Sequence, residues 1–325
     1  MVWRRILPTE ATRPARTRST RDARLDVRKT YKLYIGGAFP RSESGRSYVV
    51  SDHRGRFLAN AALASRKDAR DAVAAARKAF GGWAGRTAYN RGQVVYRIAE
   101  VLEGRRAQFV DEVQSSEGLS KPRAVDVVSS TIDRLVWYAG WADKIAQVVG
   151  STNPVAGPYF DFSIPEPTGV VAVVAPQQSS LLGLVSVVAP VVVTGNTCVV
   201  VTSYERPLPA VTLAEVLATS DVPGGVVNIL TGRAAEVAPW LASHMDVNAI
   251  DLAGVEDPRL AVDLEIAAAD NLKRVLRPTG TPLQGDGARA LGRTSGAEPD
   301  WTADPGTARM TAFLETKTVW HPIGI

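Results

Sequence analysis

The side chain best suited to covalent chemistry occurs only once in this sequence. Cys198 is the only cysteine in the chain, and it lies within the apolar run TCVVV. Burial in such surroundings raises the pKa of a thiol and makes it unreactive, so we interpret Cys198 as a packing residue. A single cysteine excludes an internal disulfide framework, and it is typical of proteins from a reducing cytoplasm. We therefore expect a cytoplasmic protein.

Histidines and charges add little to the list of reactive groups. His53, His244 and His321 are widely separated and lack metal-ligand spacing, so we expect no metal site. The net charge of +5 is modest, and much of it lies in an Arg-rich leader over residues 1–30. Such a leader is typical of a disordered tail. Because its charges are not interleaved with aromatic residues, we expect no nucleic-acid partner.

The elements that would position any site are clearest between residues 169 and 205. Residues 169–175 form a Val-rich run typical of a strand buried on both faces. Ser179 and Ser180 could cap a following helix over 181–193, and residues 197–201 form a second apolar run. This βαβ unit predicts a parallel sheet with a right-handed crossover. Neither apolar run reaches the about 20 residues that a membrane span needs, so we expect no membrane association.

The same strand–helix alternation continues along the chain and predicts a doubly wound α/β fold. The helix over 67–80 has Ser65 as its cap and Gly81-Gly82 as its end. A strand over 159–164, a strand at 247–252 and a last strand reached by residues 256–266 are also predicted. The other predicted elements are a hairpin at 32–39, helices at 93–102, 107–113, 121–145, 208–218 and 234–242, and a strand at 222–230.

Several phrases of the sequence are similar to one family. EPTGVVAVVAP (166–176), YAGWADK (138–144), PGGVVNILTG (223–232) and ETKTVW (315–320) resemble segments of NAD(P)-dependent aldehyde dehydrogenases. The resemblance covers about residues 31–275 and 312–325. It implies a coenzyme-binding, Rossmann-type parallel sheet with helices. It also implies an oligomerisation β-hairpin around residues 145–166 and a C-terminal oligomerisation strand.

The resemblance also suggests where the domains divide. Residues 31–276 would form the coenzyme-binding-like domain, with residues 310–325 as the C-terminal strand. Residues 277–309 between them are rich in Gly, Pro, Ala and Thr without an apolar period, which predicts a flexible linker. In the family a second domain with the nucleophilic cysteine begins there, so the chain resembles a truncated, degenerate member. We expect the terminal strand to pair across a subunit interface, with pairing inside its own chain as the alternative.

The positions that would carry the family's chemistry are altered. Gln178 falls where the family has the oxyanion-binding Asn, and its longer stem would misplace the amide. Glu265 aligns with the general base, but no nucleophile accompanies it. We therefore interpret Gln178 and Glu265 as vestigial and assign no catalytic residue.

The cofactor positions are altered as well. Val201 stands in place of the ribose-binding Lys, and Tyr204 stands in place of the acid that tunes the choice between NAD and NADP. Gly232 and Gly254 remain as glycines in the loops that follow strands, where backbone can approach a ligand closely. We interpret these four positions as a vestigial cofactor site, at which NAD or NADP is disfavoured.

Three hypotheses for the function follow. The first is a catalytically inactive subunit, a pseudoenzyme, that assembles with a full-length aldehyde dehydrogenase. The second is an NAD(P)-dependent aldehyde oxidoreductase with residual cofactor binding. The third is a stand-alone homo-oligomeric protein that binds another ligand in the old cleft.

Overall fold

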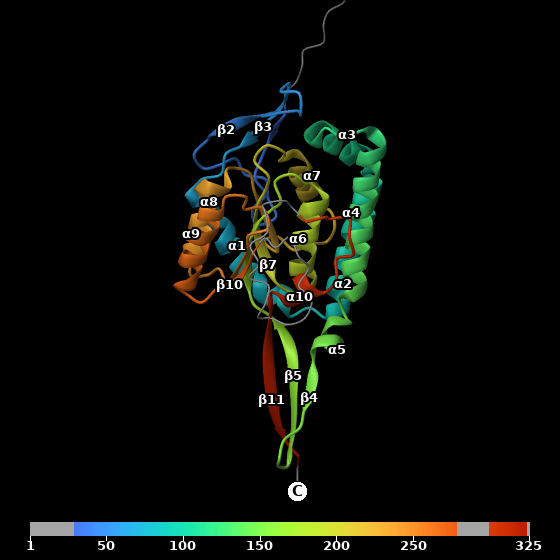
Figure 1. The fold of residues 1–325 in the computed structure, drawn as a ribbon, viewed down its shortest axis with the longest axis vertical. Helices are drawn as coiled ribbons and strands as arrows, with labels where there is room; N and C mark the ends of the chain where they lie inside the picture. The colour runs from blue at the N-terminus through green and yellow to red at the C-terminus, as the bar shows by residue number, and fades with distance from the viewer. Residues whose placement is uncertain (1–28, 278–298, 324–325) are drawn as a thin grey trace, which may run out of the picture.

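A five-stranded parallel sheet forms the centre of this protein, in a computed structural model that describes residues 29–277 and 299–323. Helices cover both faces of this sheet, and a narrow three-stranded stem projects from one end of the body (Figure 1). The strands are β1 (Thr30–Tyr31), β2 (Ser47–Ser51), β3 (Phe57–Ala62), β4 (Ser151–Asn153), β5 (Tyr159–Pro167), β6 (Val170–Val174), β7 (Thr197–Val201), β8 (Val227–Leu230), β9 (Ala249–Asp251), β10 (Arg274–Leu276) and β11 (Leu314–Pro322). The helices are α1 (Arg66–Ala84), α2 (Ala88–Gly104), α3 (Arg106–Glu117), α4 (Lys121–Trp141), α5 (Ile145–Val149), α6 (Leu182–Val193), α7 (Leu208–Leu217), α8 (Ala234–Ser243), α9 (Pro258–Ala269) and α10 (Ala308–Thr311).

The central sheet has the strand order β10-β9-β6-β7-β8, and all neighbouring strands are parallel. The chain begins this sheet at β6, extends it through β7 and β8, and then returns to add β9 and β10 on the other side. The order therefore reverses between β6 and β9, and ligands of such sheets bind at the carboxyl ends of the strands at this point. The predicted doubly wound α/β fold is confirmed.

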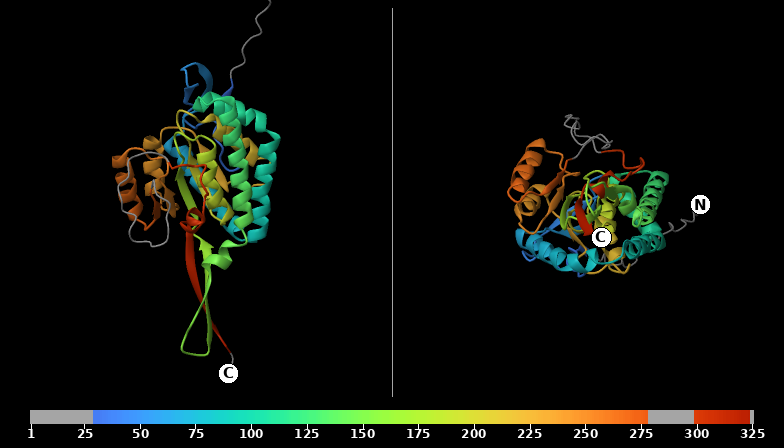
Figure 2. Two further views of the ribbon diagram at one scale, coloured as in Figure 1. Left: turned by 45° about the vertical axis from the view of Figure 1, so that its right-hand side comes forward. Right: turned by 90° about the horizontal axis from the view of Figure 1, so that it is seen from below.

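Alternating side chains of the central strands build two separate cores. On β6, Val170, Ala172 and Val174 face a cluster with α1, α8 and α9, whereas Val171 and Val173 face the helices on the opposite side. Figure 2 shows α8 and α9 on one side of the sheet and α2 and α4 on the other. Every residue of β6 and β7 is buried, which explains their uninterrupted apolar sequence.

The first long helix begins as predicted but ends later. Ser65 Oγ accepts a hydrogen bond from the Asp68 amide, and Asp68 Oδ2 accepts one from the Ser65 amide at 2.8 Å, which forms a capping box. The prediction that Gly81-Gly82 ends this helix is wrong, because α1 continues to Ala84. The indole of Trp83 is buried and donates to the Val192 carbonyl at 2.8 Å, and this contact holds the last turn against α6.

The two serines before α6 have different partners. Ser179 Oγ accepts a hydrogen bond from the Gly183 amide at 2.9 Å, but the N-cap residue of α6 is Leu181, which forms no side-chain capping bond. Ser180 does not cap the helix. Its amide and its hydroxyl both donate to Glu117 Oε1 at 2.7 Å, which ties the start of α6 to the end of α3.

The stem is an antiparallel sheet in the order β11-β5-β4. All nine residues of β11 pair with β5, from Leu314 opposite Pro167 to Pro322 opposite Tyr159. One edge of β11 therefore pairs within its own chain, which was the alternative. Its other edge has no partner strand among the described residues, so pairing of that edge across a subunit interface stays a prediction. Phe313 is buried in the body, and this anchor places β11 beside β5 of its own chain.

Residues 299–309 are packed against the body. Arg134 on α4 donates to the carbonyls of Trp301 at 2.6 Å and Ala303 at 2.8 Å. Arg309 forms an ion pair with the fully buried Asp251 at 2.5 Å. The prediction of a flexible linker is therefore wrong for these residues, because they have buried polar anchors. The remainder of that predicted linker, 278–298, lies outside the described residues, as does most of the predicted leader, 1–28.

Candidate functional site

The candidate site is the carboxyl-terminal edge of the sheet, where the strand order reverses between β6 and β9. The loop after β6 carries Gln178, and the loop after β9 carries Gly254 and Glu256. Gln178 Nε2 donates to Glu256 Oε1 at 3.2 Å, so a side-chain bond joins the two loops. The amide of Gln178 is thus engaged with a carboxylate beside the position where a ligand of such a sheet would lie.

Gly254 is needed for contact between these two loops. Its amide donates to the Val174 carbonyl at 2.8 Å. A Cβ atom at this position would lie 1.8 Å from the carbonyl oxygen of Ala175, so only glycine fits. The close approach predicted at Gly254 is therefore present, but the approaching group is the chain's own backbone.

The end of β7 offers an apolar residue and a stacked ring. Val201 is completely buried and packs in the core beside α1 and α8, so it has no hydrogen-bonding group to offer. The Tyr204 ring stacks on Tyr48 with 4.5 Å between centroids and 13° between planes. The guanidinium of Arg233 lies 4.1 Å from the centroid of the Tyr204 ring and donates to its hydroxyl at 3.2 Å. Burial raises the pKa of Tyr48 above its ordinary value.

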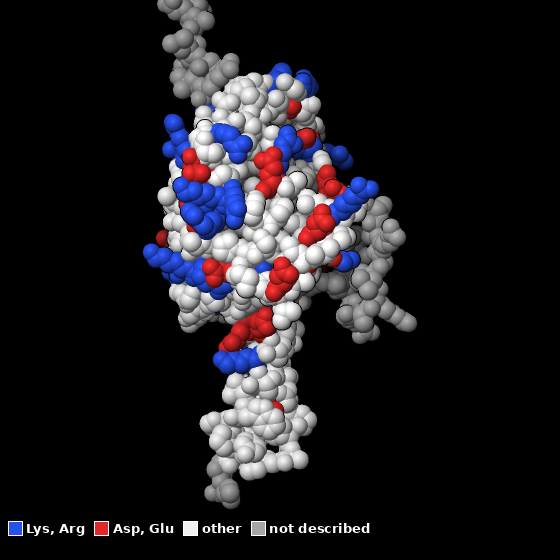
Figure 3. All heavy atoms as spheres, turned by 90° about the vertical axis from the view of Figure 1, so that its left-hand side faces the viewer, with Lys and Arg blue, Asp and Glu red and all other residues white. Residues whose placement is uncertain are grey.

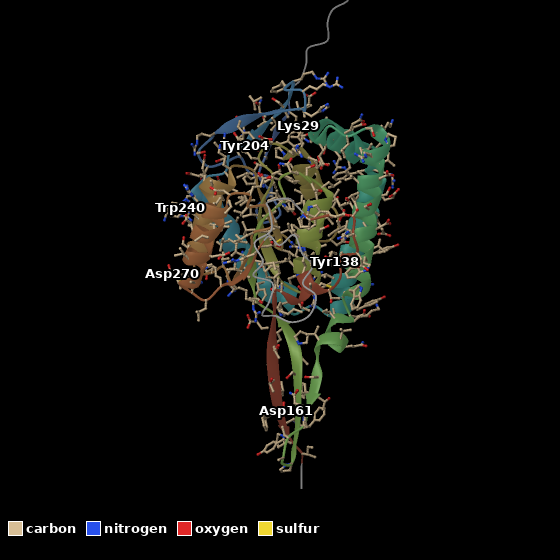
Figure 4. The ribbon with its side chains drawn as sticks, in the orientation of Figure 1. Lys29, Tyr138, Asp161, Tyr204, Trp240 and Asp270 are labelled. Carbon is tan, nitrogen blue, oxygen red and sulfur yellow. The ribbon has the colours of Figure 1, made fainter. Side chains whose placement is uncertain are left out.

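Hydrogen bonds from Gln177 hold the same loops together. Its Nε2 donates to the Ala175 carbonyl at 2.7 Å, and its Oε1 accepts from the Tyr204 amide at 3.2 Å. Its carbonyl accepts from the Ser203 hydroxyl at 2.9 Å. The loops after β6 and β7 therefore form one bonded unit. Figure 4 shows Tyr204 at the end of the body away from the stem, in which Asp161 lies.

Gly232 follows β8 and lies beside this unit. Its φ of +152° is in a region that favours glycine, and the nearest atom to an added Cβ would be the Ala64 amide nitrogen at 3.5 Å. The residue therefore has a conformational role at the start of the turn into α8. The next residue, Arg233, carries the guanidinium that covers Tyr204.

Glu265 does not belong to this site. The prediction that residues 256–266 lead into a strand, with Glu265 at the position of the general base, is wrong. Asp257 caps a helix by accepting from the Arg259 amide at 2.9 Å, and Pro258 occupies its first turn, so Glu265 lies within α9. Its carboxylate is paired with Arg277 instead. The last strand is β10, which comes after this helix.

Cys198 is a core residue, as predicted. Its side chain is completely buried in β7, and this burial raises the pKa of the thiol to about 12. Since the thiolate is the reactive form, Cys198 has no nucleophilic character in the folded protein. Among the residues that the structure describes, no group of three or more His, Cys, Asp or Glu side chains could hold a metal ion. No helix in the described ranges is long and apolar enough to cross a membrane.

Sequence reasoning missed three residues that shape this edge: Tyr48, Arg233 and Glu256. Tyr48 comes from a separate small sheet, so no local signal links it to Tyr204. Arg233 and Glu256 each follow a strand end by a few residues, and that placement could have revealed them.

The residues at this edge fit a dinucleotide poorly. A ribose would need hydrogen-bonding groups at the end of β7, where Val201 is apolar and Tyr204 lies between a tyrosine ring and a guanidinium. A pyrophosphate would need free backbone near the end of β9, where Gly254 is in contact with Ala175. The carboxylate of Glu256 would add negative charge close to the phosphates.

Comparisons with known proteins agree with this fold. The family model described as "Aldehyde dehydrogenase family" matches residues 39–281. Aldehyde dehydrogenase family 2 member B4, mitochondrial, from Arabidopsis thaliana is 34% identical over 253 residues, which cover 77% of this chain and 46% of that protein. Retinal dehydrogenase 2 from Gallus gallus is 34% identical over 262 residues, covering 79% of this chain and 49% of that protein.

A solved structure gives the same relationship. An aldehyde dehydrogenase from Bacillus cereus, the G224D mutant, superposes with a TM-score of 0.72 at 25% identity, covering 77% of this chain and 50% of that one. The chain thus spans about half the length of the relatives that it matches. The sequence match and the shared fold together show that this protein belongs to the aldehyde dehydrogenase family.

Proposed function

We propose that this protein is a catalytically inactive, aldehyde-dehydrogenase-like subunit that assembles with a full-length aldehyde dehydrogenase. Two features support its inactivity. The only cysteine in the sequence is buried in the core, and hydrogen bonds join the loops at the carboxyl-terminal edge of the sheet, which we call the nucleotide edge. The observation that supports assembly with a partner is the exposed apolar side chains on one face of the stem. The chain would stabilise or position its active partner.

The two faces of the stem differ in chemistry. Because side chains alternate along a strand, Phe160, Phe162 and Ile164 of β5 share one face, and Val319 of β11 lies opposite Phe162 on that face. Phe160 is 46% exposed and Ile164 is 38% exposed, so no other part of the described chain covers this face. Lys317 and His321 of β11 lie on the same face as these apolar residues, opposite Ile164 and Phe160. The other face holds the hydrogen bond between Ser163 and Thr318 and the exposed ring of Trp320. An exposed apolar surface of this kind is typical of an interface.

A second surface has the same character. On α9, Val262 and Ile266 are spaced four residues apart and therefore lie on one side of the helix. They are 51% and 65% exposed, and Leu272 just beyond the helix is 91% exposed. Apolar side chains on an outer helix favour contact with another subunit over contact with water.

Paired substitutions on the stem test the assembly. Phe160→Thr with Ile164→Thr removes apolar area while keeping residues that favour strands. We expect this double variant to lose association with the partner enzyme during co-purification. The matched control is Trp320→Thr, which removes a ring that is 58% exposed on the opposite face of the same sheet. The proposal fails if the double variant still co-purifies at the wild-type level.

A nucleotide titration separates this proposal from residual oxidoreductase activity. We expect NAD and NADP, added to the purified chain up to about millimolar concentration, to give no saturable heat signal in calorimetry, since catalytic cofactor sites bind much more tightly. Saturable binding at micromolar concentration would favour the oxidoreductase hypothesis instead. A chain that forms only complexes with itself would favour the stand-alone binding protein.

A further inference from the structure

A surface hollow lies between the start of α1 and the end of α8, away from the stem (Figure 4). Its volume is about 660 Å³. Basic side chains gather in the upper part of the molecular face that α1, α8 and α9 share (Figure 3). The residues that line the hollow are Glu43, Ser65, Arg66, Lys67, Ala69, Arg70, Trp240, Leu241, Ser243, His244 and Met245.

One wall of the hollow is an aromatic ring with a cation beside it. The Trp240 ring is 41% exposed, and the guanidinium carbon of Arg66 lies 3.8 Å from the ring centroid. Met245, which is 70% exposed, adds a flexible apolar side chain to the same wall. Figure 4 shows Trp240 on the outer side of α8. An exposed ring, an exposed thioether and a guanidinium together suit a ligand with a flat apolar part and a negative charge.

The charges around the hollow leave one cation in excess. Lys67 is paired with Glu43 at 2.8 Å, and Arg70 is paired with Asp71 at 2.8 Å. Arg66 has no carboxylate partner among the residues that the structure describes, and its contact is the Trp240 ring. The two ion pairs are exposed and exchange readily with solvent or a ligand.

A histidine side chain also lines the hollow. His244 Nδ1 accepts a hydrogen bond from the Asp246 amide at 3.1 Å. In the neutral ring this assigns the proton to Nε2, which becomes a donor. The hollow therefore combines a guanidinium and an imidazole donor with an exposed aromatic surface.

We propose that this hollow binds a small organic anion that carries a flat apolar group, either an aromatic carboxylate or an aromatic phosphate ester. The anionic group would bind the Arg66 guanidinium, which forms charge-assisted hydrogen bonds with both kinds of oxyanion. The apolar group would lie against Trp240 and Met245. The residues of this site differ from those of the proposed assembly surfaces, so it would add a ligand site to a protein whose loops at the sheet edge are joined by hydrogen bonds.

Indole N–H signals in a ¹⁵N–¹H NMR titration provide the test, and Trp240→Phe identifies the signal of that indole. The probes are benzoate and phenyl phosphate, with benzylamine as an aromatic compound of opposite charge. We expect benzoate or phenyl phosphate to shift the Trp240 signal saturably, whereas benzylamine leaves it unchanged. Benzoate alone would assign the carboxylate class, and phenyl phosphate alone the phosphate ester. Equal shifts with all three, or no saturation, would overturn the proposal.

Charge variants complete the experiment. Arg66→Gln should weaken binding about tenfold, the size expected from losing one hydrogen bond to a charged group, whereas Arg66→Lys should retain most of it. The matched control is Arg97→Gln, which neutralises an exposed arginine on α2, where it is paired with Glu100. Unchanged spectral dispersion would show that each variant is folded. Wild-type affinity in Arg66→Gln would contradict the proposed site.

Discussion

The thiol of Cys198 illustrates how single residues decide the chemistry of this chain. It lies in β7 with no exposed surface, and burial raises its pKa to about 12. We expect it to be unreactive toward a small disulfide reagent near neutral pH while the protein is folded, because thiolate and access are both lacking. Unfolding in urea should release one reactive thiol per chain, which the absorbance of the reagent would measure. Rapid reaction in the native protein would contradict this assignment.

Glu112 should make stability depend on pH. Burial raises the pKa of its carboxyl, although hydrogen bonds from Thr212 and Gln108 act in the opposite direction. A carboxyl with a raised pKa keeps its proton to a higher pH in the folded state than in the unfolded state. Its contribution to stability is therefore fully present below the unfolded pKa, about 4.3, and is lost as the pH rises through the folded pKa. The glutamine of the Glu112→Gln variant cannot ionise. The unfolding free energy of this variant, relative to that of the wild type, should therefore increase between about pH 4 and about pH 7. Urea unfolding at both pH values measures this, and a relative loss at the higher pH would contradict it.

At the scale of elements, the start of α1 depends on its cap. Ser65 accepts from the Asp68 amide, so Ser65→Ala should lower the free energy of unfolding by about 1 kcal/mol. The control is Ser120→Ala at the start of α4, where the serine forms no side-chain capping bond and the change should be close to zero. Urea denaturation of both variants makes the comparison. Equal losses would show that the capping bond of Ser65 contributes nothing specific.

The segment that leads into β11 depends on a buried ion pair. Asp251 is fully buried and Arg309 has an 18% exposed side chain, so Arg309→Met would leave an unpaired carboxylate in the core. Such a change costs about 3–5 kcal/mol, whereas replacing both partners costs less. We therefore expect Arg309→Met with Asp251→Asn to be more stable than Arg309→Met alone in thermal unfolding. A double variant that is less stable than the single one would disprove this coupling.

The sequence was most informative where structure is set locally. The apolar runs of β6 and β7 and the capping signal at Ser65 depend on near neighbours, and all three are confirmed. Glu265 was misplaced because a short run resembling a family motif outweighed the helix signals of Asp257 and Pro258. Local sequence also could not reveal which edge β11 would join, since any open strand edge could accept it.

The candidate site was only partly predictable for the same reason. Three of its residues, Gln178, Tyr204 and Gly254, follow strand ends as expected, and Val201 is the last residue of β7. Their partners come from distant parts of the chain, so the sequence alone predicted loss of ligand contacts but not what replaced them. The stacking of Tyr48 on Tyr204 joins residues more than 150 positions apart, and only the fold brings them together.

At the scale of the whole molecule, the bonded nucleotide edge and the apolar stem lie at opposite ends of the body (Figures 1 and 4). Substitutions at one end therefore need not affect the other, because distant sites usually act independently. This separation is consistent with a subunit that has kept its surfaces for assembly while its site changed. Variants of the stem and variants of the nucleotide edge should accordingly have separable effects.

The most direct test of this account is native mass spectrometry of the tagged protein, isolated under gentle salt conditions from the cells that produce it. The account predicts a complex in which this chain is bound to a full-length aldehyde dehydrogenase subunit. It also predicts that Phe160→Thr with Ile164→Thr removes that complex while Trp320→Thr retains it. Recovery of this chain only as a monomer, or only in complexes with itself, would contradict the central claim.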